Sequence, residues 1–193
     1  VTGAEKAVLH EPMIGQVEAD AVSRCIAGGF VSSVGPAITQ FENMLCDYTG
    51  AEHAVAVVNG TAALHLMLVT SDIGLNNEVL VPALTFVATG NAILQANAIP
   101  HFVDSSPVDL GIDVSKLDRY LTDISEMRNG CCCNVKTGRI ISHVMPVHVF
   151  GHIGNVEGLK ALAERYNIKI VEDSAEALGS WKGGCHAGLF GTC

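Results

Sequence analysis

The stretch that decides the fold spans residues 168–180 and reads IKIVEDSAEALGS. An apolar strand runs here directly into acids and small residues. In open α/β folds, ligands bind at the carboxyl ends of the strands, so Asp173 is expected to lie at that edge of a sheet. From these residues alone an alternative stays open, namely that Glu172 and Asp173 only cap the following turn. The rest of the chain has to decide between them.

Length and composition narrow the class of protein. With 193 residues, the chain can bury a sizeable core, and one domain is the default expectation. Its hydrophobic content of 49% excludes disorder, and the excess of small and aliphatic residues over aromatic ones suits strands that lie between helices. The net charge of −9, with 11 scattered Lys and Arg residues, argues against binding to nucleic acid.

No apolar run reaches the length needed to span a membrane, and the N-terminal sequence VTGAEKAVLHEP lacks the layout of a signal peptide. We therefore expect a cytoplasmic protein with no membrane partner. The cysteines are odd in number, and adjacent cysteines at 131–133 cannot easily converge on one ion, so we expect no metal site. The remaining cysteines are expected to be free thiols: Cys25, Cys46, Cys185 and Cys193.

Two helices are expected before the first strand. Apolar residues follow helical spacing over 14–27, and Gly28-Gly29 is a typical helix end. A short glycine-bounded loop over 30–35 contains Ser32 and Ser33, after which Pro36 starts a second helix that Gly50 stops.

The next segment predicts an anion-binding turn. Residues 54–58 read AVAVV, which indicates a buried parallel strand, and a buried helix is expected from Thr61 to about residue 69. A glycine and a hydroxyl residue at a helix start offer free backbone N–H groups and the positive end of the helix dipole. Since the longer glycine patterns of nucleotide-binding loops are missing, a single phosphate is the expected guest. Alternatively, Thr61 is simply the N-cap of the helix.

Strands and helices then alternate to the end of the chain. A long polar and cysteine-rich excursion over 122–139 interrupts them, and Pro100 suits an edge strand because it cannot donate a hydrogen bond. The alternation predicts a three-layer α/β/α fold with a mostly parallel sheet, in which residues 60–61, 82–86, 148–152 and 173–176 share one edge. The expected strands span 78–82, 99–103, 142–149 and 169–171, and the expected helices span 86–96, 114–121 and 156–166.

Four ordered motifs, VVNGTAALHLML, VPALTFVATGNAI, PVHVFGH and VEDSAEALGS, resemble the DegT/DnrJ/EryC1/StrS family of pyridoxal-phosphate-dependent sugar aminotransferases. The resemblance runs from about Leu9 to the last residue. It implies the large domain of a fold-type-I aminotransferase and an activity on nucleotide-linked 4-keto-6-deoxy sugars, in polysaccharide or amino-sugar biosynthesis. It further implies an amino donor as second substrate and a homo-oligomer.

The resemblance also implies roles for single residues. Gly60, Thr61 and Ala62 match the cradle for the cofactor phosphate. Phe86 matches an aromatic ring against the pyridine face, with core packing as its alternative role. Asp173 matches the carboxylate that pairs with the protonated pyridine nitrogen. The remaining matches are Glu176, near the phenolic oxygen of the cofactor, where a carboxylate would repel a phenolate unless paired, and Ser32 and Ser33, near the substrate.

In the family, the lysine that forms the Schiff base follows the position of Asp173 only after another strand and loop. This chain does not contain that lysine and departs from the family pattern here. No catalytic residue is therefore assigned, and the chain is expected to be inactive alone. We expect a single partial domain over residues 1–193, with N-terminal helices over 14–50, a cofactor-binding part over 51–193, and no C-terminal small domain. The six lysines lie on tails, helices, loops or a strand start and do not substitute for the missing one: Lys6, Lys116, Lys136, Lys160, Lys169 and Lys182.

Three functions stay open from the sequence. The first is the cofactor-binding portion of a sugar aminotransferase. The second is a truncated, non-catalytic module that self-associates or binds a partner through unfinished sheet edges and exposed helices. The third is a generic nucleotide-binding α/β domain without relation to pyridoxal phosphate.

Overall fold

A computed structural model describes residues 12–191, and Lys6, Leu9 and Cys193 lie outside the described part. The chain divides into two compact units. The first contains the described residues 12–48 and 52–56, and the second contains residues 49–51 and 57–191. No helix among the described residues combines the length and the apolar character needed to cross a bilayer.

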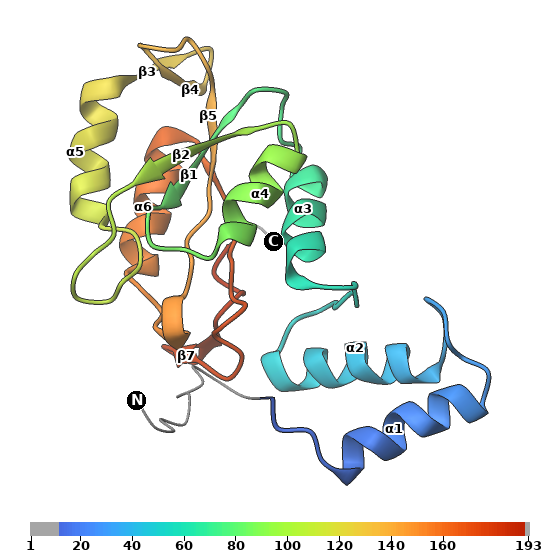
Figure 1. The fold of residues 1–193 in the computed structure, drawn as a ribbon. Coiled ribbons are helices and arrows are strands. Elements are labelled where there is room, and N and C mark those ends of the chain that lie inside the picture. The colour runs from blue at the N-terminus through green and yellow to red at the C-terminus, as the bar shows by residue number, and fades with distance from the viewer. Residues whose placement is uncertain (1–11, 192–193) are drawn as a thin grey trace, which may run out of the picture. The chain divides into compact units, whose positions relative to one another are not determined.

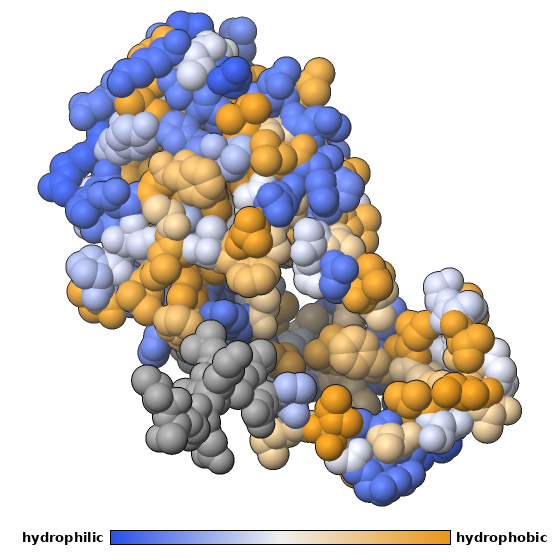
Figure 2. All heavy atoms as spheres, in the orientation of Figure 1, coloured by the Kyte–Doolittle hydropathy of each residue, from blue (hydrophilic) through white to orange (hydrophobic). Residues whose placement is uncertain are grey.

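The first unit carries the two helices expected from the sequence, α1 (Gln16–Ala27) and α2 (Pro36–Thr49). The backbone N–H of Gly15 donates to the Glu18 carboxylate over 2.7 Å at the start of α1, and Gly29 follows its end with a left-handed φ of +74°. No residue of either helix is buried, although both carry apolar residues such as Val17 and Phe41. Figure 2 shows orange, hydrophobic spheres on the surface of these helices.

The second unit is built on a parallel sheet of four strands in the order β2-β1-β5-β6 (Figure 1). The strands are β1 (Glu78–Pro82), β2 (Ile99–Val103), β5 (Ile141–Val144) and β6 (Lys169–Ile170). All three pairings are parallel. Pro100 lies in the edge strand β2, as its missing N–H predicts.

Helices cover both faces of this sheet, which confirms the three-layer arrangement (Figure 1). On one face, α3 (Gly60–Thr70) and α4 (Val87–Gln95) pack with Val79 and Val81 of β1. On the other face, α5 (Val114–Ile124) and α6 (Val156–Tyr166) pack with Leu80. Successive residues of β1 thus belong to two separate hydrophobic cores, because side chains alternate between the two faces of a sheet.

The prediction of a buried strand over residues 54–58 is wrong. These residues form no strand, and Val55 and Val58 are exposed. An apolar run becomes a strand only where a neighbouring strand takes up its backbone hydrogen bonds, and no strand among residues 12–191 pairs with it. The helix that follows is also less buried than expected: only Leu64 and Leu68 are buried in α3.

The polar excursion expected over residues 122–139 is partly ordered. Helix α5 continues to Ile124, and an antiparallel hairpin of β3 (Ser125–Arg128) and β4 (Cys131–Asn134) follows. Cys132 and Cys133 are buried in β4, and the described cysteines are all free thiols. Strand β5 ends at Val144, earlier than expected, and the shorter elements are η1 (Val149–Gly151), β7 (Trp181–Lys182) and β8 (Cys185–His186).

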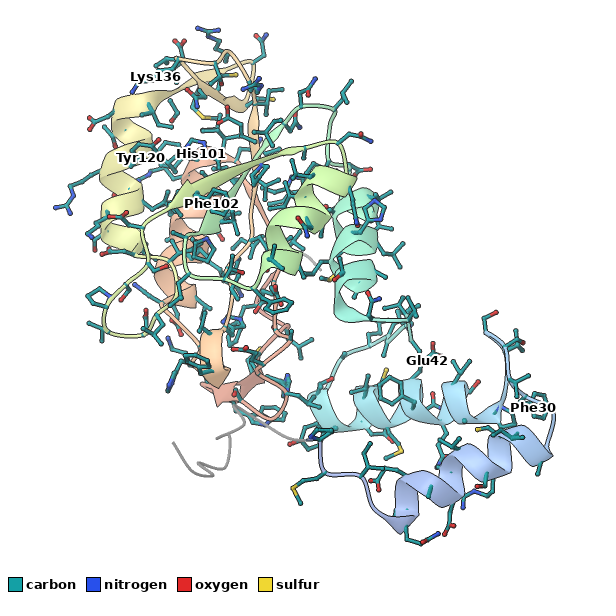
Figure 3. All side chains as sticks on the ribbon, in the orientation of Figure 1. Phe30, Glu42, His101, Phe102, Tyr120 and Lys136 are labelled. Carbon is teal, nitrogen blue, oxygen red and sulfur yellow. The ribbon has the colours of Figure 1, made fainter. Side chains whose placement is uncertain are left out.

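A polar cluster closes the amino end of the sheet. The buried Glu78 carboxylate of β1 accepts hydrogen bonds from Thr137 and Asn134, and it lies 2.7 Å from Nδ1 of His101. Figure 3 shows His101 of β2 and Tyr120 of α5 pointing toward each other, with 3.0 Å between Nε2 and the phenol oxygen. Burial raises the pKa of Glu78, but the three hydrogen bonds outweigh it and leave that pKa below its ordinary value.

Candidate functional site

A pocket of about 580 Å³ lies at the carboxyl ends of the strands in the second unit. Four segments line it: the start of α3, the loop between β1 and α4, the segment after β5, and the segment after β6. These are the segments that the sequence places on one edge of the sheet, so this part of the prediction is confirmed. The isolated bridge between Val147 and Asp173 holds two of them side by side.

The start of α3 presents backbone N–H groups to the pocket. Asn59 is the N-cap, and its side-chain oxygen accepts the N–H of Ala62 over 2.9 Å. The alternative that Thr61 caps the helix is therefore wrong. Within the described residues, the N–H groups of Gly60 and Thr61 have no hydrogen-bond acceptor, and both residues line the pocket. Ala62 does not line it, and its role in a cradle stays a prediction.

Phe86 is the N-cap of α4 and forms part of the pocket wall. Its side chain is 73% exposed, so core packing does not explain the residue. The backbone N–H of Thr89 donates to the carbonyl of Phe86 over 3.1 Å, which fixes the ring-bearing residue to the first turn of the helix.

Asp173 lines the pocket from the segment after β6 and is only 6% exposed. Its Oδ2 accepts a hydrogen bond from the hydroxyl of Thr89 over 2.7 Å. Its Oδ1 accepts the N–H of Ala175 over 3.3 Å. The carboxylate therefore caps the turn and also lines the pocket, and its pairing with a cofactor stays a prediction.

Glu172 serves a different purpose from its neighbour. Its Oε1 accepts the N–H groups of Phe190 and Gly191, and its Oε2 accepts that of Gly188 and lies 2.8 Å from Nε2 of His148. The carboxylate is fully buried. It thus attaches the C-terminal part of the described chain to the segment after β6, a role that sequence reasoning missed because three of its four partners are backbone N–H groups.

Glu176 lines the pocket and accepts the N–H of Phe150 over 2.6 Å. Phe150 itself has a left-handed φ of 53°, an uncommon conformation for a bulky residue, and the neighbouring Gly151 has a φ of +81°. The carboxylate of Glu176 therefore holds a strained turn at the pocket edge.

Two groups of residues are not part of this pocket as described. Ser32 and Ser33 are exposed in the loop between α1 and α2 of the first unit, and their role toward a substrate stays a prediction. None of the described lysines lines the pocket. Lys116 and Lys182 form ion pairs with Asp104 and Glu157, respectively.

Comparison with known proteins places these features in context. Residues 12–193 match the family model described as the DegT/DnrJ/EryC1/StrS aminotransferase family. The GDP-perosamine synthase of Caulobacter vibrioides is 36% identical over 182 residues, which cover 94% of this chain and 45% of that protein. The chain thus spans about half the length of the curated relatives that it matches.

Solved structures agree with the sequence comparison. A DegT DnrJ EryC1 StrS aminotransferase from Brucella abortus is 33% identical with a TM-score of 0.78, over 90% of this chain and 44% of that one. NtdA from Bacillus subtilis, whose structure contains the bound cofactor PMP, is 25% identical with a TM-score of 0.72, over 88% of this chain and 35% of that one.

Proposed function

Because this chain belongs to the DegT/DnrJ/EryC1/StrS aminotransferase family, we infer that it is the cofactor-binding portion of a pyridoxal-phosphate-dependent aminotransferase. We propose a nucleotide-linked 4-keto-6-deoxy sugar as its substrate class. The observation that carries the proposal is the pocket in which an open helix start, an exposed aromatic ring and a buried carboxylate meet.

The residues present fit the cofactor. Its phosphate suits the start of α3, where Gly60 and Thr61 offer N–H groups without an acceptor at the positive end of the helix dipole. A Cβ added to Gly60 would meet no atom within 4 Å, so the space above the glycine is open to a ligand. The pocket volume of about 580 Å³ is in the range of small-molecule sites.

The ring of the cofactor suits the space between Phe86 and Asp173. An exposed aromatic side chain at a pocket wall offers a flat apolar face for stacking. Asp173 offers a buried acceptor that would hold a proton on the pyridine nitrogen. When bound, the cofactor supplies an electron-withdrawing ring that stabilises negative charge at the amino-bearing carbon of the substrate.

Glu176 is proposed to lie near the phenolic oxygen of the cofactor. One of its oxygen atoms accepts the N–H of Phe150. This charge-assisted hydrogen bond partly compensates the negative charge of the carboxylate. This pairing reduces the repulsion between the carboxylate and a phenolate.

The substrate class rests on relatives. The name of the curated relative, GDP-perosamine synthase, supports a nucleotide-linked amino sugar as product. We propose that turnover requires a lysine and an amino donor, and that this chain alone binds the cofactor without turning it over, since none of the described lysines lines the pocket.

Calorimetry of the chain with pyridoxamine 5'-phosphate tests the proposal, with nucleotide sugars as the comparison. We expect binding of the cofactor and no absorption band of a lysine-bound form after addition of pyridoxal phosphate. A band that borohydride reduces would disprove the proposed inactivity. Binding of a nucleotide sugar, without binding of either cofactor form, would instead support the generic nucleotide-binding domain.

A second candidate function is a non-catalytic module that self-associates. It is favoured by the helices α1 and α2, whose apolar residues are not buried in the part of the chain that the structure describes. Such faces call for a covering surface, and a second copy of the chain would offer one. Light scattering that finds a stable monomer at high concentration would contradict this function.

A further inference from the structure

The carboxylate of Asp173 is held by a chain of two threonine hydroxyls. Thr89 of α4 is fully buried, and its Oγ1 lies 2.7 Å from Oδ2 of Asp173. Thr85, which precedes the helix, places its own Oγ1 2.7 Å from Oγ1 of Thr89. All three side chains therefore form one continuous hydrogen-bonded row beside the pocket.

The direction of these hydrogen bonds follows from counting hydrogens. A hydroxyl group has one hydrogen, and a carboxylate group only accepts. Thr89 therefore spends its hydrogen on Asp173, and Thr85 must donate to Thr89. The other acceptor within reach of Thr85, the carbonyl of Phe86, is more distant at 3.4 Å. Donors aligned in this way polarise one another, which strengthens the last bond to the carboxylate.

The same helix start carries the aromatic wall of the pocket. Phe86 lies between the two threonines in sequence, and its carbonyl accepts the backbone N–H of Thr89. One rigid turn therefore sets the positions of Phe86 and of the Thr89 hydroxyl together. A carboxylate that turns away from this hydroxyl would also lose its alignment with a ring stacked on Phe86.

We propose that Thr89 is a positioning residue for Asp173: its hydroxyl, held in turn by Thr85, fixes the carboxylate in the orientation that meets the pyridine nitrogen of the cofactor. This inference rests on the proposed function. It adds a residue that need not touch the cofactor itself.

The test separates positioning from a merely structural role. Titrations of the full chain use pyridoxamine 5'-phosphate and an analogue in which carbon replaces the ring nitrogen. We expect Thr89→Val to weaken binding of the natural cofactor about tenfold and to change binding of the carbon analogue less than about twofold. Thr89→Ser, which keeps the hydroxyl, should restore binding to within about threefold of the original.

A matched control is Thr70→Val in α3. Thr70 is exposed, and its hydroxyl lies within hydrogen-bond distance of the carbonyls of Leu66 and Met67 in its own helix, at 2.9 Å and 3.1 Å. The control should bind both ligands as the unmodified chain does. If Thr89→Val fails to fold, Thr85→Val serves instead, with an expected loss of about threefold that is confined to the natural cofactor. A loss that is equal for both ligands, or no loss at all, would overturn the proposal.

Binding by the unmodified chain distinguishes a failure of the proposed function from a failure of the proposed role of Thr89. If it binds no pyridoxamine 5'-phosphate, the proposed function fails. Crystal structures of the ligand-free chain and of the threonine variant then decide the role of Thr89 alone. An Asp173 side chain that turns or becomes disordered in the variant supports positioning, and an unchanged side chain overturns it.

Discussion

Nε2 of His148 lies 2.8 Å from Oε2 of Glu172, and both side chains are buried. The pair lies between the pocket, which His148 lines, and the C-terminal part of the described chain, which Glu172 holds through three backbone N–H groups. Changing one member of such a buried network is destabilising, because it leaves other buried polar groups without a hydrogen-bond partner.

Glu172→Gln should therefore destabilise the fold by about 3 kcal/mol. Each carboxylate oxygen accepts two hydrogen bonds, and an amide places its NH₂ group against two of these donors in either orientation. Urea denaturation measures the loss, and hydrogen exchange should show that the amides of residues 188–191 lose protection first. The control Glu164→Gln changes an exposed residue of α6 and should stay within about 0.5 kcal/mol of the original. Equal stability of the two variants would contradict this assignment.

Gly60→Ala should separate ligand binding from folding. An added Cβ meets no atom within 4 Å, so the free energy of unfolding should change by less than about 1 kcal/mol. The same Cβ would occupy space above the helix start, and affinity for pyridoxamine 5'-phosphate should fall about tenfold, whereas affinity for pyridoxamine without phosphate should not change. Gly90→Ala in α4, where the new Cβ makes an ordinary 3.8 Å contact with Phe102, is the matched control. Unchanged phosphate dependence in Gly60→Ala would exclude the cradle.

Asp173→Asn should weaken binding of pyridoxamine 5'-phosphate about tenfold or more, because a neutral amide cannot form a charge-assisted hydrogen bond to a protonated ring nitrogen. The amide oxygen can still accept from Thr89, so the fold should remain intact. Fluorescence titration measures the affinity, and Asp123→Asn on the exposed side of α5 is the control. If both variants bind equally well, Asp173 has no such role.

The buried imidazole of His143 should make the fold less stable in mild acid. Burial lowers the pKa of its side chain; the hydrogen bond to the Ser71 carbonyl acts against this shift and the charge of Lys169 adds to it. The folded state disfavours the charged imidazole. The stability of the fold is therefore greatest above about pH 6.5, the pKa of a histidine in the unfolded chain, and declines as the pH falls below that value. Urea denaturation between pH 8 and pH 5 should show a smaller decline for His143→Gln than for the unmodified chain. Parallel curves would assign the decline to other groups.

Much of the fold could be predicted because local patterns and tertiary packing agree. The strand Glu78–Pro82 and the helix Val156–Tyr166 have the bounds expected from their sequences. The segment 54–58 shows the limit of such reasoning: its pattern indicates a buried strand, but the outcome depends on a hydrogen-bond partner that its own residues cannot specify.

The candidate site divides in the same way. Phe86 and Asp173 follow the strands β1 and β6, so the topology alone brings them to one edge. Gly60 lines the same pocket although the strand expected before it does not form. Thr89 could not be predicted, because it lies inside a helix and meets a carboxylate 84 residues further along the chain. Glu172 gave no signal either, since backbone N–H groups are present at every residue except proline and leave no trace in a sequence.

The buried cysteines of the β3–β4 hairpin make the opening of this hairpin measurable by thiol labelling. Burial raises the pKa of the Cys132 thiol, and only a thiolate reacts with disulfide reagents. Cys132 can therefore be labelled only when the hairpin opens, whereas the partly exposed Cys25, Cys46 and Cys185 can be reached without it. The delay between the labelling of the partly exposed cysteines and that of Cys132 reports how often the hairpin opens, and no cysteine has to be added by mutation.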